Sequence, residues 1–270
     1  MIPFKIFCLT IYNKNYDFFN KLGFTPVGLG LNSYNDDWLL DNVGKNISNK
    51  NKFYGEYTFH YWLWKNYLNN FSNNKWIGFC TYRRFWTLKD CQYESVDFFK
   101  NNIITTEQEF WKNSEVILAE KLKINKIKKI KIIKNFGVIN SILNSKILFK
   151  KKHSLVDHFR IFHGNYHINE AIKLLPKKDR LGFEEYLNNF SFNPHNLFIC
   201  RGPKILEEFY NNIFSWLFKC ENKFNMDKLK GYEIRMLGFL AEHFVSYWFH
   251  KNFSVYENPI TFFDTNINLP

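Results

Sequence analysis

One segment constrains the fold of this chain more than any other: the apolar run WIGFC at residues 76–80, which ends at the polar sequence TYRR. A short run of strand-forming apolar residues predicts a buried strand. Before it, residues 56–71 carry apolar and aromatic side chains on all sides at helical spacing, which predicts a largely buried helix. Another apolar run, residues 4–10, predicts a second strand. This order predicts an α/β fold with a mixed or parallel central sheet and helices on both faces.

The remaining segments continue this pattern, and we expect a single domain over residues 1–270. Residues 121–152 differ, because they contain eleven lysines among isoleucines, which predicts a lysine-rich insertion or an exposed basic ribbon. The other predictions, in chain order, are the start of a helix at 12–23, a strand or loop at 24–31, a loop at 36–55, helices at 153–190, a turn and strand at 193–200, amphipathic helices at 205–224 and 231–251, and an irregular tail at 255–265.

The net charge of the chain is +12 over 270 residues. A protein this basic is attracted to anions, whether nucleic acid, an acidic membrane surface or a phosphorylated substrate, and charge alone does not choose among them. Only six of the 37 basic residues are arginine, yet Arg83 and Arg84 are adjacent. The guanidinium fork, which binds phosphate or carboxylate through two parallel hydrogen bonds, gives a reason for such a pair.

The cysteines and the apolar segments indicate a cytoplasmic protein. The five cysteines form no C-x-x-C pair, which is typical of reduced thiols and not of a disulfide framework. No stretch reaches the roughly 18 uninterrupted apolar residues of a membrane-spanning helix. The N-terminus lacks a small-residue cleavage site after its apolar start, so we interpret it as the first strand and not as a signal peptide.

The carboxyl end of the strand at 76–80 is the first candidate site. In open α/β sheets, ligands bind beyond the carboxyl ends of the strands, so Tyr82, Arg83 and Arg84 are predicted to face a cleft. Two guanidinium groups at such an edge suit a diphosphate. The alternative is that both arginines pair with surface acids or cap helices.

Several segments together resemble a known family. NISNKNKFYGEYTFHYWLWKN begins at Asn46 and WIGFCTYRRFW at Trp76, and HNLFIC, WLFKCE and RMLGFLAEH extend the similarity over most of the chain. They are similar to bacterial glycosyltransferases found in capsule and exopolysaccharide gene clusters, a family long catalogued as a domain of unknown function. The positions that match its pattern in the first two segments are Asn46, Ile47, Ser48, Lys50, Asn51, Glu56, Tyr61, Trp62, Trp64, Lys65, Asn66, Ile77, Gly78, Cys80, Tyr82, Arg83 and Arg84.

The chain departs from the family pattern at two positions. The family histidine before Tyr-Arg-Arg is Thr81 here, and the family arginine after Ala-Glu is His243. If that histidine acts as a catalytic base in the family, Thr81 leaves this role open.

The resemblance implies a GT-A-like domain that binds a nucleotide sugar, which we expect to be a UDP-sugar. It also implies transfer of the sugar to a growing capsular or other surface polysaccharide, with a polysaccharide or a lipid-linked oligosaccharide as acceptor. During transfer, negative charge collects on the leaving diphosphate, and preorganised cations stabilise such charge. We therefore expect Arg83 and Arg84 to act in catalysis, with Glu242 as the general base for the acceptor hydroxyl.

Other polar residues are candidates for donor binding, and each has a structural alternative. Glu56 suits a hydrogen bond to the donor sugar or ribose, but is also a favourable charge at a helix start. Glu242 and Arg235 share a helical face, which suits a site or a simple ion-pair network. His60 on a buried helix is typical of a core histidine, and the polar loop before that helix suits phosphate contacts or a plain capping turn. The candidate donor-binding residues are Asn46, Ser48, Asn51, Glu56, His60, Tyr82 and Arg235.

The sequence offers no clear metal site. Many GT-A enzymes hold a divalent metal with Asp-x-Asp at a strand end, but Asp36, Asp37 and Asp41 do not follow an apolar strand in this chain. We therefore expect no cofactor, with guanidinium groups in place of the metal. If Mn²⁺ or Mg²⁺ is required, Asp41 is the first ligand candidate.

Two other classes of function fit parts of the sequence. A non-catalytic assembly module of a capsule complex would carry the family pattern without turnover. A nucleic-acid-binding protein would use the basic charge and the aromatics near Arg83. Because the basic residues cluster in one stretch without a binding-fold signature, we expect no nucleic-acid partner. The lysines of 121–152 favour peripheral binding to an anionic inner-membrane surface, at about 1 kcal/mol each, or form a solvated face.

Overall fold

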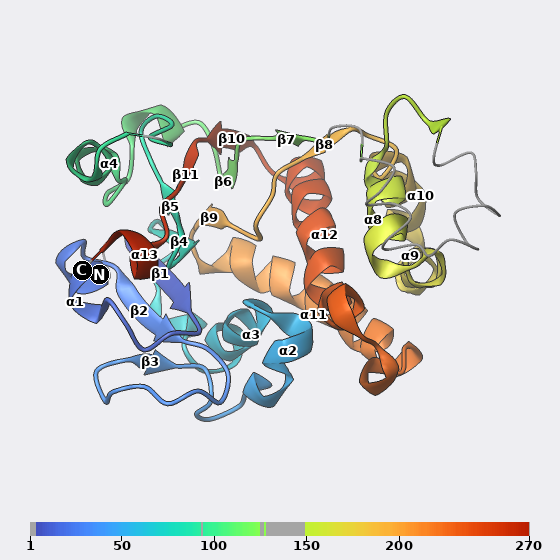
Figure 1. Ribbon diagram of the computed structural model, residues 1–270, viewed down its shortest axis with the longest axis horizontal. Helices are drawn as coiled ribbons and strands as arrows, with labels where there is room; N and C mark the ends of the chain where they lie inside the picture. The colour runs from blue at the N-terminus through green and yellow to red at the C-terminus, as the bar shows by residue number, and fades with distance from the viewer. Residues whose placement is uncertain (1–3, 93, 125–126, 128–148, 270) are drawn as a thin grey trace.

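The computed structural model describes residues 4–92, 94–124, 127 and 149–269, and its centre is a large β-sheet (Figure 1). The main row of strands has the order β10-β6-β9-β4-β1-β2-β3, and β5 pairs with both β4 and β11. The strands are β1 (Lys5–Thr10), β2 (Thr25–Gly28), β3 (Leu39–Leu40), β4 (Trp76–Thr81), β5 (Arg84–Trp86), β6 (Val116–Ala119), β7 (Leu122–Lys123), β8 (Ser191–Phe192), β9 (Phe198–Arg201), β10 (Val255–Asn258) and β11 (Ile260–Phe262).

The sheet is mixed, which is one of the two forms that the sequence predicts. β1 lies between β2 and β4 and is parallel to both, and β10 is parallel to β6. β9 runs antiparallel to β4 on one side and to β6 on the other. Since β9 is reversed, its first residues lie at the same edge of the sheet as the last residues of β4. That edge therefore collects the ends of β1 and β4 and the start of β9.

Helices cover both faces of the sheet, which confirms the predicted fold class. Along β1 and β4, alternate side chains belong to two separate hydrophobic clusters, so both faces are buried. All six residues of β4 are buried. The α-helices are α1 (Tyr16–Lys21), α2 (Asn51–Tyr54), α3 (Tyr57–Asn66), α4 (Val96–Asn102), α8 (Leu155–His163), α9 (Asn165–Leu174), α10 (Lys177–Tyr186), α11 (Pro203–Lys223), α12 (Met236–Asn252) and α13 (Thr265–Asn268). The 3₁₀ helices are η1 (Ser48–Lys50), η2 (Leu68–Asn70), η3 (Glu109–Trp111), η4 (Met226–Lys228) and η5 (Gly231–Arg235).

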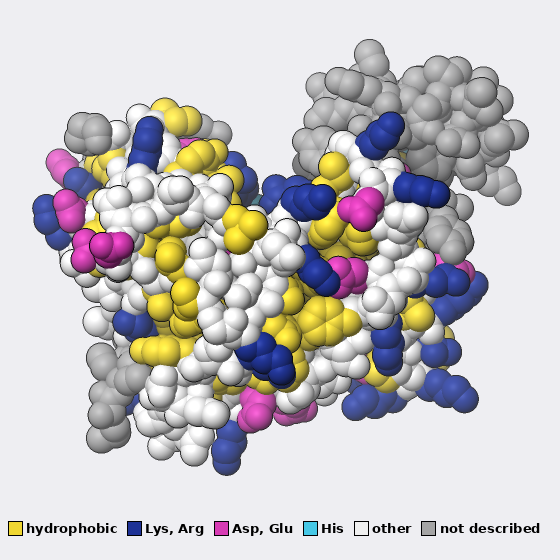
Figure 2. Space-filling view, turned by 90° about the horizontal axis from the view of Figure 1, so that it is seen from below, with side chains coloured by type: hydrophobic (Ala, Val, Ile, Leu, Met, Phe, Trp, Pro, Cys, Tyr) yellow, Lys and Arg dark blue, Asp and Glu magenta, His cyan; other side chains and the backbone are white. Residues whose placement is uncertain are grey.

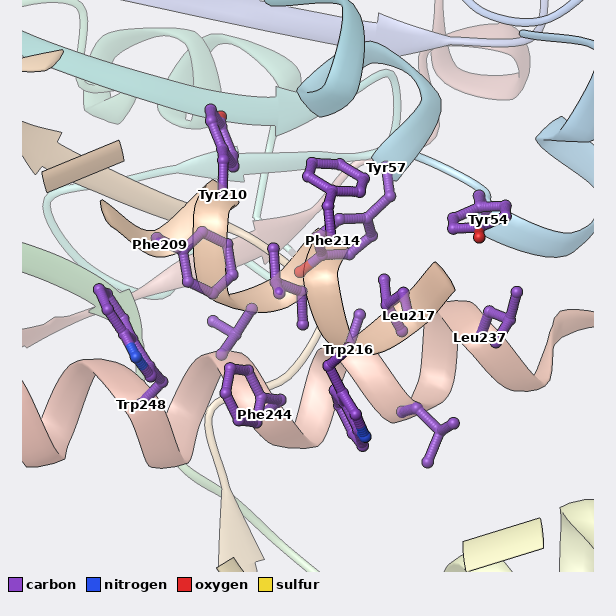
Figure 3. Close-up of a cluster of buried hydrophobic side chains, with 14 of the residues drawn as sticks. Tyr54, Tyr57, Phe209, Tyr210, Phe214, Trp216, Leu217, Leu237, Phe244 and Trp248 are labelled. Atoms are coloured by element: carbon purple, nitrogen blue, oxygen red, sulfur yellow. The ribbon is translucent and has the colours of Figure 1, made fainter. Parts of the chain in front are cut away.

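The larger cluster is centred on α11 and α12. Figure 3 shows aromatic side chains of α11, among them Phe209 and Trp216, facing Phe244 and Trp248 of α12. Burial of one such aromatic side chain contributes about 1.5–3 kcal/mol. The helix predicted at 231–251 is present, as η5 and α12. Its predicted amphipathic character is wrong for most of α12, because this helix is buried on most sides between α11 and neighbouring helices.

The irregular tail predicted for residues 255–265 is also wrong. β10 pairs with β6 through the register Val255–Val116, and β11 pairs with β5 through Phe262–Arg84. Both strands are short, and Pro259 separates them, so neither gives a strong pattern in the sequence. Tertiary pairing, and not local propensity, makes this segment part of the sheet.

The predicted lysine-rich insertion at 121–152 lies largely outside the described residues. Of its described part, Leu122–Lys123 form β7, which pairs with β8. Figure 2 shows one face of the molecule, on which Lys and Arg side chains gather on the side that carries α8, α9 and α10 in Figure 1. No helix in the described ranges has the length and apolar character needed to cross a membrane.

Candidate functional site

A pocket of about 290 Å³ opens at the edge of the sheet where β1 and β4 end. It is closed on the other sides by the start of α3, the turn before β9 and the first turns of α12. This is the position at which open α/β sheets bind ligands. Its lining residues are Leu9, Thr10, Ile11, Leu29, Phe53, Gly55, Glu56, Thr81, Tyr82, Arg83, Arg84, His195, Asn196, Arg235, Gly238, Phe239 and Glu242.

The structure brings six of the predicted site residues together in this pocket. They come from three separate parts of the chain: the end of β4, the start of α3 and the region around the start of α12. The six residues are Glu56, Tyr82, Arg83, Arg84, Arg235 and Glu242. Both candidate arginines thus line a pocket, as the strand-end argument predicts.

The two arginines stand on a tight connection between β4 and β5, in which Thr81 pairs with Arg84. Residues of the C-terminal segment form hydrogen bonds to the backbone of this connection. The backbone N–H of Phe263 donates to the carbonyl of Arg83 at 3.1 Å. The hydroxyl of Thr265 donates to the carbonyl of Tyr82 at 2.9 Å, and the Thr265 N–H donates to the same oxygen at 3.2 Å. The tail therefore fixes the backbone from which the guanidinium groups project.

The guanidinium of Arg84 lies 5.4 Å from the ring centre of Phe262, in a cation–π contact. Burial, and then the neighbouring charge of Arg83, lower the pKa of Arg84, while Glu242 and Glu56 oppose this shift. An arginine stays protonated at any physiological pH even when its pKa is lowered. The pocket therefore contains fixed positive charge beside two carboxyl groups.

Glu242 on α12 has a pKa raised to about 7, chiefly because it is buried. The charge of Glu56 raises this pKa further, while a hydrogen bond from the backbone N–H of His195 and the charges of Arg84 and Arg235 lower it. A carboxyl group with a pKa near neutrality can both accept and release a proton under physiological conditions.

Gly55, directly before Glu56, connects α2 to α3 and lies close to Arg235. Gly55 has φ 55° and ψ −131°, a conformation that side chains disfavour. A Cβ atom at this position would lie 3.4 Å from Nη2 of Arg235. Since this distance is an ordinary contact, the positive φ of Gly55, and not a lack of space, is what disfavours a side chain at this position.

His195 and Asn196 were not predicted as site residues, although both line the pocket. They have φ angles of 79° and 54°, in the left-handed region that non-glycine residues rarely adopt. Burial, and then the charges of Arg84 and Arg83, lower the pKa of His195 to about 3, so its imidazole is neutral. The turn signal of Asn-Pro-His-Asn before β9 was visible in the sequence, but its approach to α12 was not.

Four predicted donor-binding residues lie outside the pocket lining. Asn46 and Ser48 bond to each other at 2.8 Å in the turn before α2. The amide of Asn51 donates to the Gly55 carbonyl at 2.9 Å and so braces the connection to α3. His60 is fully buried, its Nδ1 lies 2.9 Å from the Tyr210 hydroxyl, and burial lowers its pKa to about 3. In the structure His60 is a core residue.

Asp41, the fallback metal ligand, is fully buried directly after β3 and does not line the pocket. Its Oδ1 accepts a hydrogen bond from the Gly30 N–H at 2.9 Å, and burial raises its pKa to about 6. Within the described part of the chain, no three His, Cys, Asp or Glu side chains are grouped as metal ligands would be. Among the described residues, no cluster of three or more potential metal ligands lies at this edge of the sheet.

The two positions that depart from the family pattern have different surroundings. Thr81 lines the pocket and is 7% exposed, and its hydroxyl has no hydrogen-bond partner among the described residues. His243 lies outside the pocket, packed against Phe192 and Phe159, and burial lowers its pKa to about 3. Only the first departure therefore changes the pocket wall.

Comparison with known proteins supports the fold and identifies the family. The structure is similar to that of WbbM, described as a bifunctional glycosyltransferase in its apo form, with a TM-score of 0.70 and 21% sequence identity. The similarity covers 97% of this chain and 45% of that one, so this chain spans less than half of the WbbM chain. No curated protein sequence gives a significant match. A family model matches residues 6–253. The chain therefore belongs to the family described as Domain of unknown function (DUF4422).

Proposed function

We propose that this protein is a glycosyltransferase that moves a sugar from a nucleotide-sugar donor, a UDP-sugar in the first instance, to a capsular or other surface polysaccharide. One observation carries the proposal: a single pocket at the carboxyl edge of the sheet unites Arg83 and Arg84 with Glu242. The similarity of fold to a protein described as a glycosyltransferase supports it. So does the family pattern in the sequence.

The arginines suit the diphosphate of the donor. Guanidinium groups bind phosphate oxygens through paired, charge-assisted hydrogen bonds. As the anomeric bond breaks, charge grows on the leaving nucleoside diphosphate, and fixed cations that need no reorganisation stabilise it. Arg83 and Arg84 are held for this purpose by the backbone contacts to the C-terminal segment. Arg235, at the start of α12, adds a third guanidinium to the same pocket.

Glu242 suits the role of general base. With a pKa of about 7, an appreciable fraction of it is ionised at neutral pH. In the proposed reaction the acceptor hydroxyl gives its proton to Glu242 and its oxygen forms a bond to the anomeric carbon. The bond from that carbon to the diphosphate breaks, and its electron pair leaves with the nucleotide. The neutral imidazole of His195 can hydrogen-bond a sugar hydroxyl as donor or acceptor.

The requirement for a metal ion stays a prediction. Arg83 and Arg84 occupy the strand end at which acidic ligands are expected in metal-dependent enzymes of this architecture, and Asp41 is buried outside the pocket. We propose that the guanidinium groups take over the electrostatic role of the metal. Activity in the presence of a chelator tests this directly.

A screen of UDP-, GDP-, CDP- and dTDP-sugars by thermal shift tests the proposed function first. A donor present at about 100 times its dissociation constant stabilises the folded state by roughly 2.7 kcal/mol. The donor that stabilises the protein is then incubated with it, and hydrolysis or transfer is followed. A non-catalytic assembly module predicts the absence of turnover, and a protein that responds to none of the four donor classes contradicts our proposal.

A further inference from the structure

One side chain, Asn196, connects the two elements that carry the carboxyl groups of the pocket. Its Oδ1 accepts a hydrogen bond from the hydroxyl of Tyr57 at 3.2 Å, and its Nδ2 donates to the carbonyl of Gly238 at 3.3 Å. Tyr57 directly follows Glu56 at the start of α3. Gly238 lies one helical turn before Glu242 on α12. Asn196 thus bonds to α3 beside one carboxylate and to α12 beside the other.

The backbone around Asn196 is held in an unusual conformation. His195 and Asn196 are two of the three non-glycine residues with positive φ in the described part of the chain, and they are consecutive. Left-handed residues other than glycine are unfavourable and persist where the surrounding structure fixes them, often at functional sites. Here the turn directs the N–H of His195 to Oε1 of Glu242. The same turn directs the Asn196 side chain between Tyr57 and Gly238.

We propose that Asn196 is a positioning residue of this site: by holding α3 to α12, it sets where Glu242 lies relative to Glu56. In this proposal it acts through the two helices and the His195 amide, because its side-chain oxygen bonds to Tyr57 on α3 and its side-chain nitrogen to Gly238 on α12. The inference rests on the proposed function only where it predicts a change in the rate of sugar transfer. The separation of the two carboxyl groups is a property of the folded chain.

The position of Glu242 determines its proton affinity. Burial and the nearby charge of Glu56 raise its pKa, so the group gains protons more readily than an ordinary carboxyl group. Without the Asn196 contacts, α3 and α12 can separate, and more water can reach Glu242, which is now only partly exposed in the pocket. Burial is the largest cause of the raised pKa, so its loss outweighs a weaker hydrogen bond from His195, and the pKa of Glu242 falls toward its ordinary value. The titratable and charged groups that surround Glu242 are Glu56, Tyr57, Arg84, Tyr186, His195 and Arg235.

The substitution Asn196→Gly tests the proposal, because glycine adopts the left-handed backbone freely and removes both side-chain hydrogen bonds. Asn15→Gly is the matched control. Asn15 also has a positive φ, 62°, and its side chain bonds to Asn266 at 3.3 Å, but it does not line the pocket. Tyr57→Phe removes one of the two hydrogen bonds of Asn196 and serves as a milder second variant.

Two pH profiles are measured for each variant. The first is the rate of sugar transfer. The second is the free energy of unfolding with and without the additional change Glu242→Gln, which reports the titration of Glu242 in the absence of any substrate. If the wild type turns over no nucleotide sugar, the proposed function fails, but the second profile still tests the role of Asn196.

We expect Asn196→Gly to lower the midpoint of the Glu242 titration by about one pH unit in both profiles. Tyr57→Phe should shift the midpoint less and in the same direction, while Asn15→Gly should leave it in place. A lower melting temperature of Asn196→Gly with an unchanged Glu242 midpoint would overturn the proposal. That result would assign Asn196 a purely structural role.

Discussion

The backbone N–H of His195 donates to Oε1 of Glu242 at 2.5 Å, so the turn before β9 fixes a carboxyl group that belongs to α12. Forty-seven residues separate the two in the sequence. Glu242, with its raised pKa, and the neutral imidazole of His195 line the same pocket as the guanidinium groups of Arg83 and Arg84.

The first prediction concerns stability and pH. The pKa of Glu242 is raised from 4.5 to about 7 in the folded state. Between these values the folded chain binds a proton that the unfolded chain releases, so stability falls as pH rises through this window. The shift corresponds to about 3 kcal/mol. Denaturant unfolding from pH 4 to pH 8 should show that the advantage of Glu242→Gln over the wild type increases across the window. Parallel stability curves for the two proteins would contradict the raised pKa.

The second prediction concerns the guanidinium fork. Replacing Arg83 or Arg84 by Lys keeps the positive charge but loses the paired hydrogen bonds to phosphate. One hydrogen bond to a charged group contributes roughly 1.5–3 kcal/mol. Transfer should therefore slow by about tenfold to a hundredfold, with little change in melting temperature. Arg201→Lys is the control, because Arg201 is exposed on β9 outside the pocket. A lower melting temperature with a normal rate would indicate that the arginines serve stability only.

The third prediction concerns the C-terminal segment, which lies beyond the matched region 6–253. Thr265→Val removes the hydroxyl that bonds to the Tyr82 carbonyl. A hydrogen bond of this kind contributes about 0.5–1.5 kcal/mol, so turnover should fall by up to about tenfold. Thr265→Ser keeps the hydroxyl and should restore the rate. Equal rates for the Val and Ser variants would show that the tail does not act on the arginine motif.

The fourth prediction concerns metal ions. Because arginines occupy the strand end and Asp41 is buried away from the pocket, we expect transfer to persist in EDTA. The measurement is the initial rate before and after exhaustive chelation. Loss of the rate with recovery on addition of Mn²⁺ or Mg²⁺ would reverse this conclusion. Glu56 and Glu242, the carboxyl groups that line the pocket, would then replace Asp41 as the first ligand candidates.

The strand-end part of the site follows from the sequence. A continuous apolar run such as WIGFC has few alternatives to a buried strand, and the residues after it must then lie at the edge of the sheet. The aromatic helix α3 is equally clear from its apolar and aromatic side chains at helical spacing. In the structure, seven of its ten residues are buried. These two elements place Glu56, Arg83 and Arg84 before any tertiary information is used.

The remainder depends on long-range contacts that a local pattern does not contain. The left-handed turn at His195 and Asn196 is stabilised by α3 and α12, and β10 and β11 become strands only through their partners in the sheet. At His60, the local pattern leaves two interpretations open that only the tertiary structure separates. The sequence offers donor binding and a core position as alternatives for His60, and the structure shows the second, with the ring buried against Tyr210.

The proposed role of Glu242 is tested most directly by the release of nucleoside diphosphate from the donor by the wild type and by Glu242→Gln. Loss of a general base lowers the rate by about 10²–10⁴-fold, while donor affinity should change little because the arginines remain. Glu208→Gln, at an exposed position of α11, is the matched control and should behave as the wild type. We predict this large loss of rate with nearly unchanged donor affinity. Equal rates of release for wild type and Glu242→Gln would contradict the central claim.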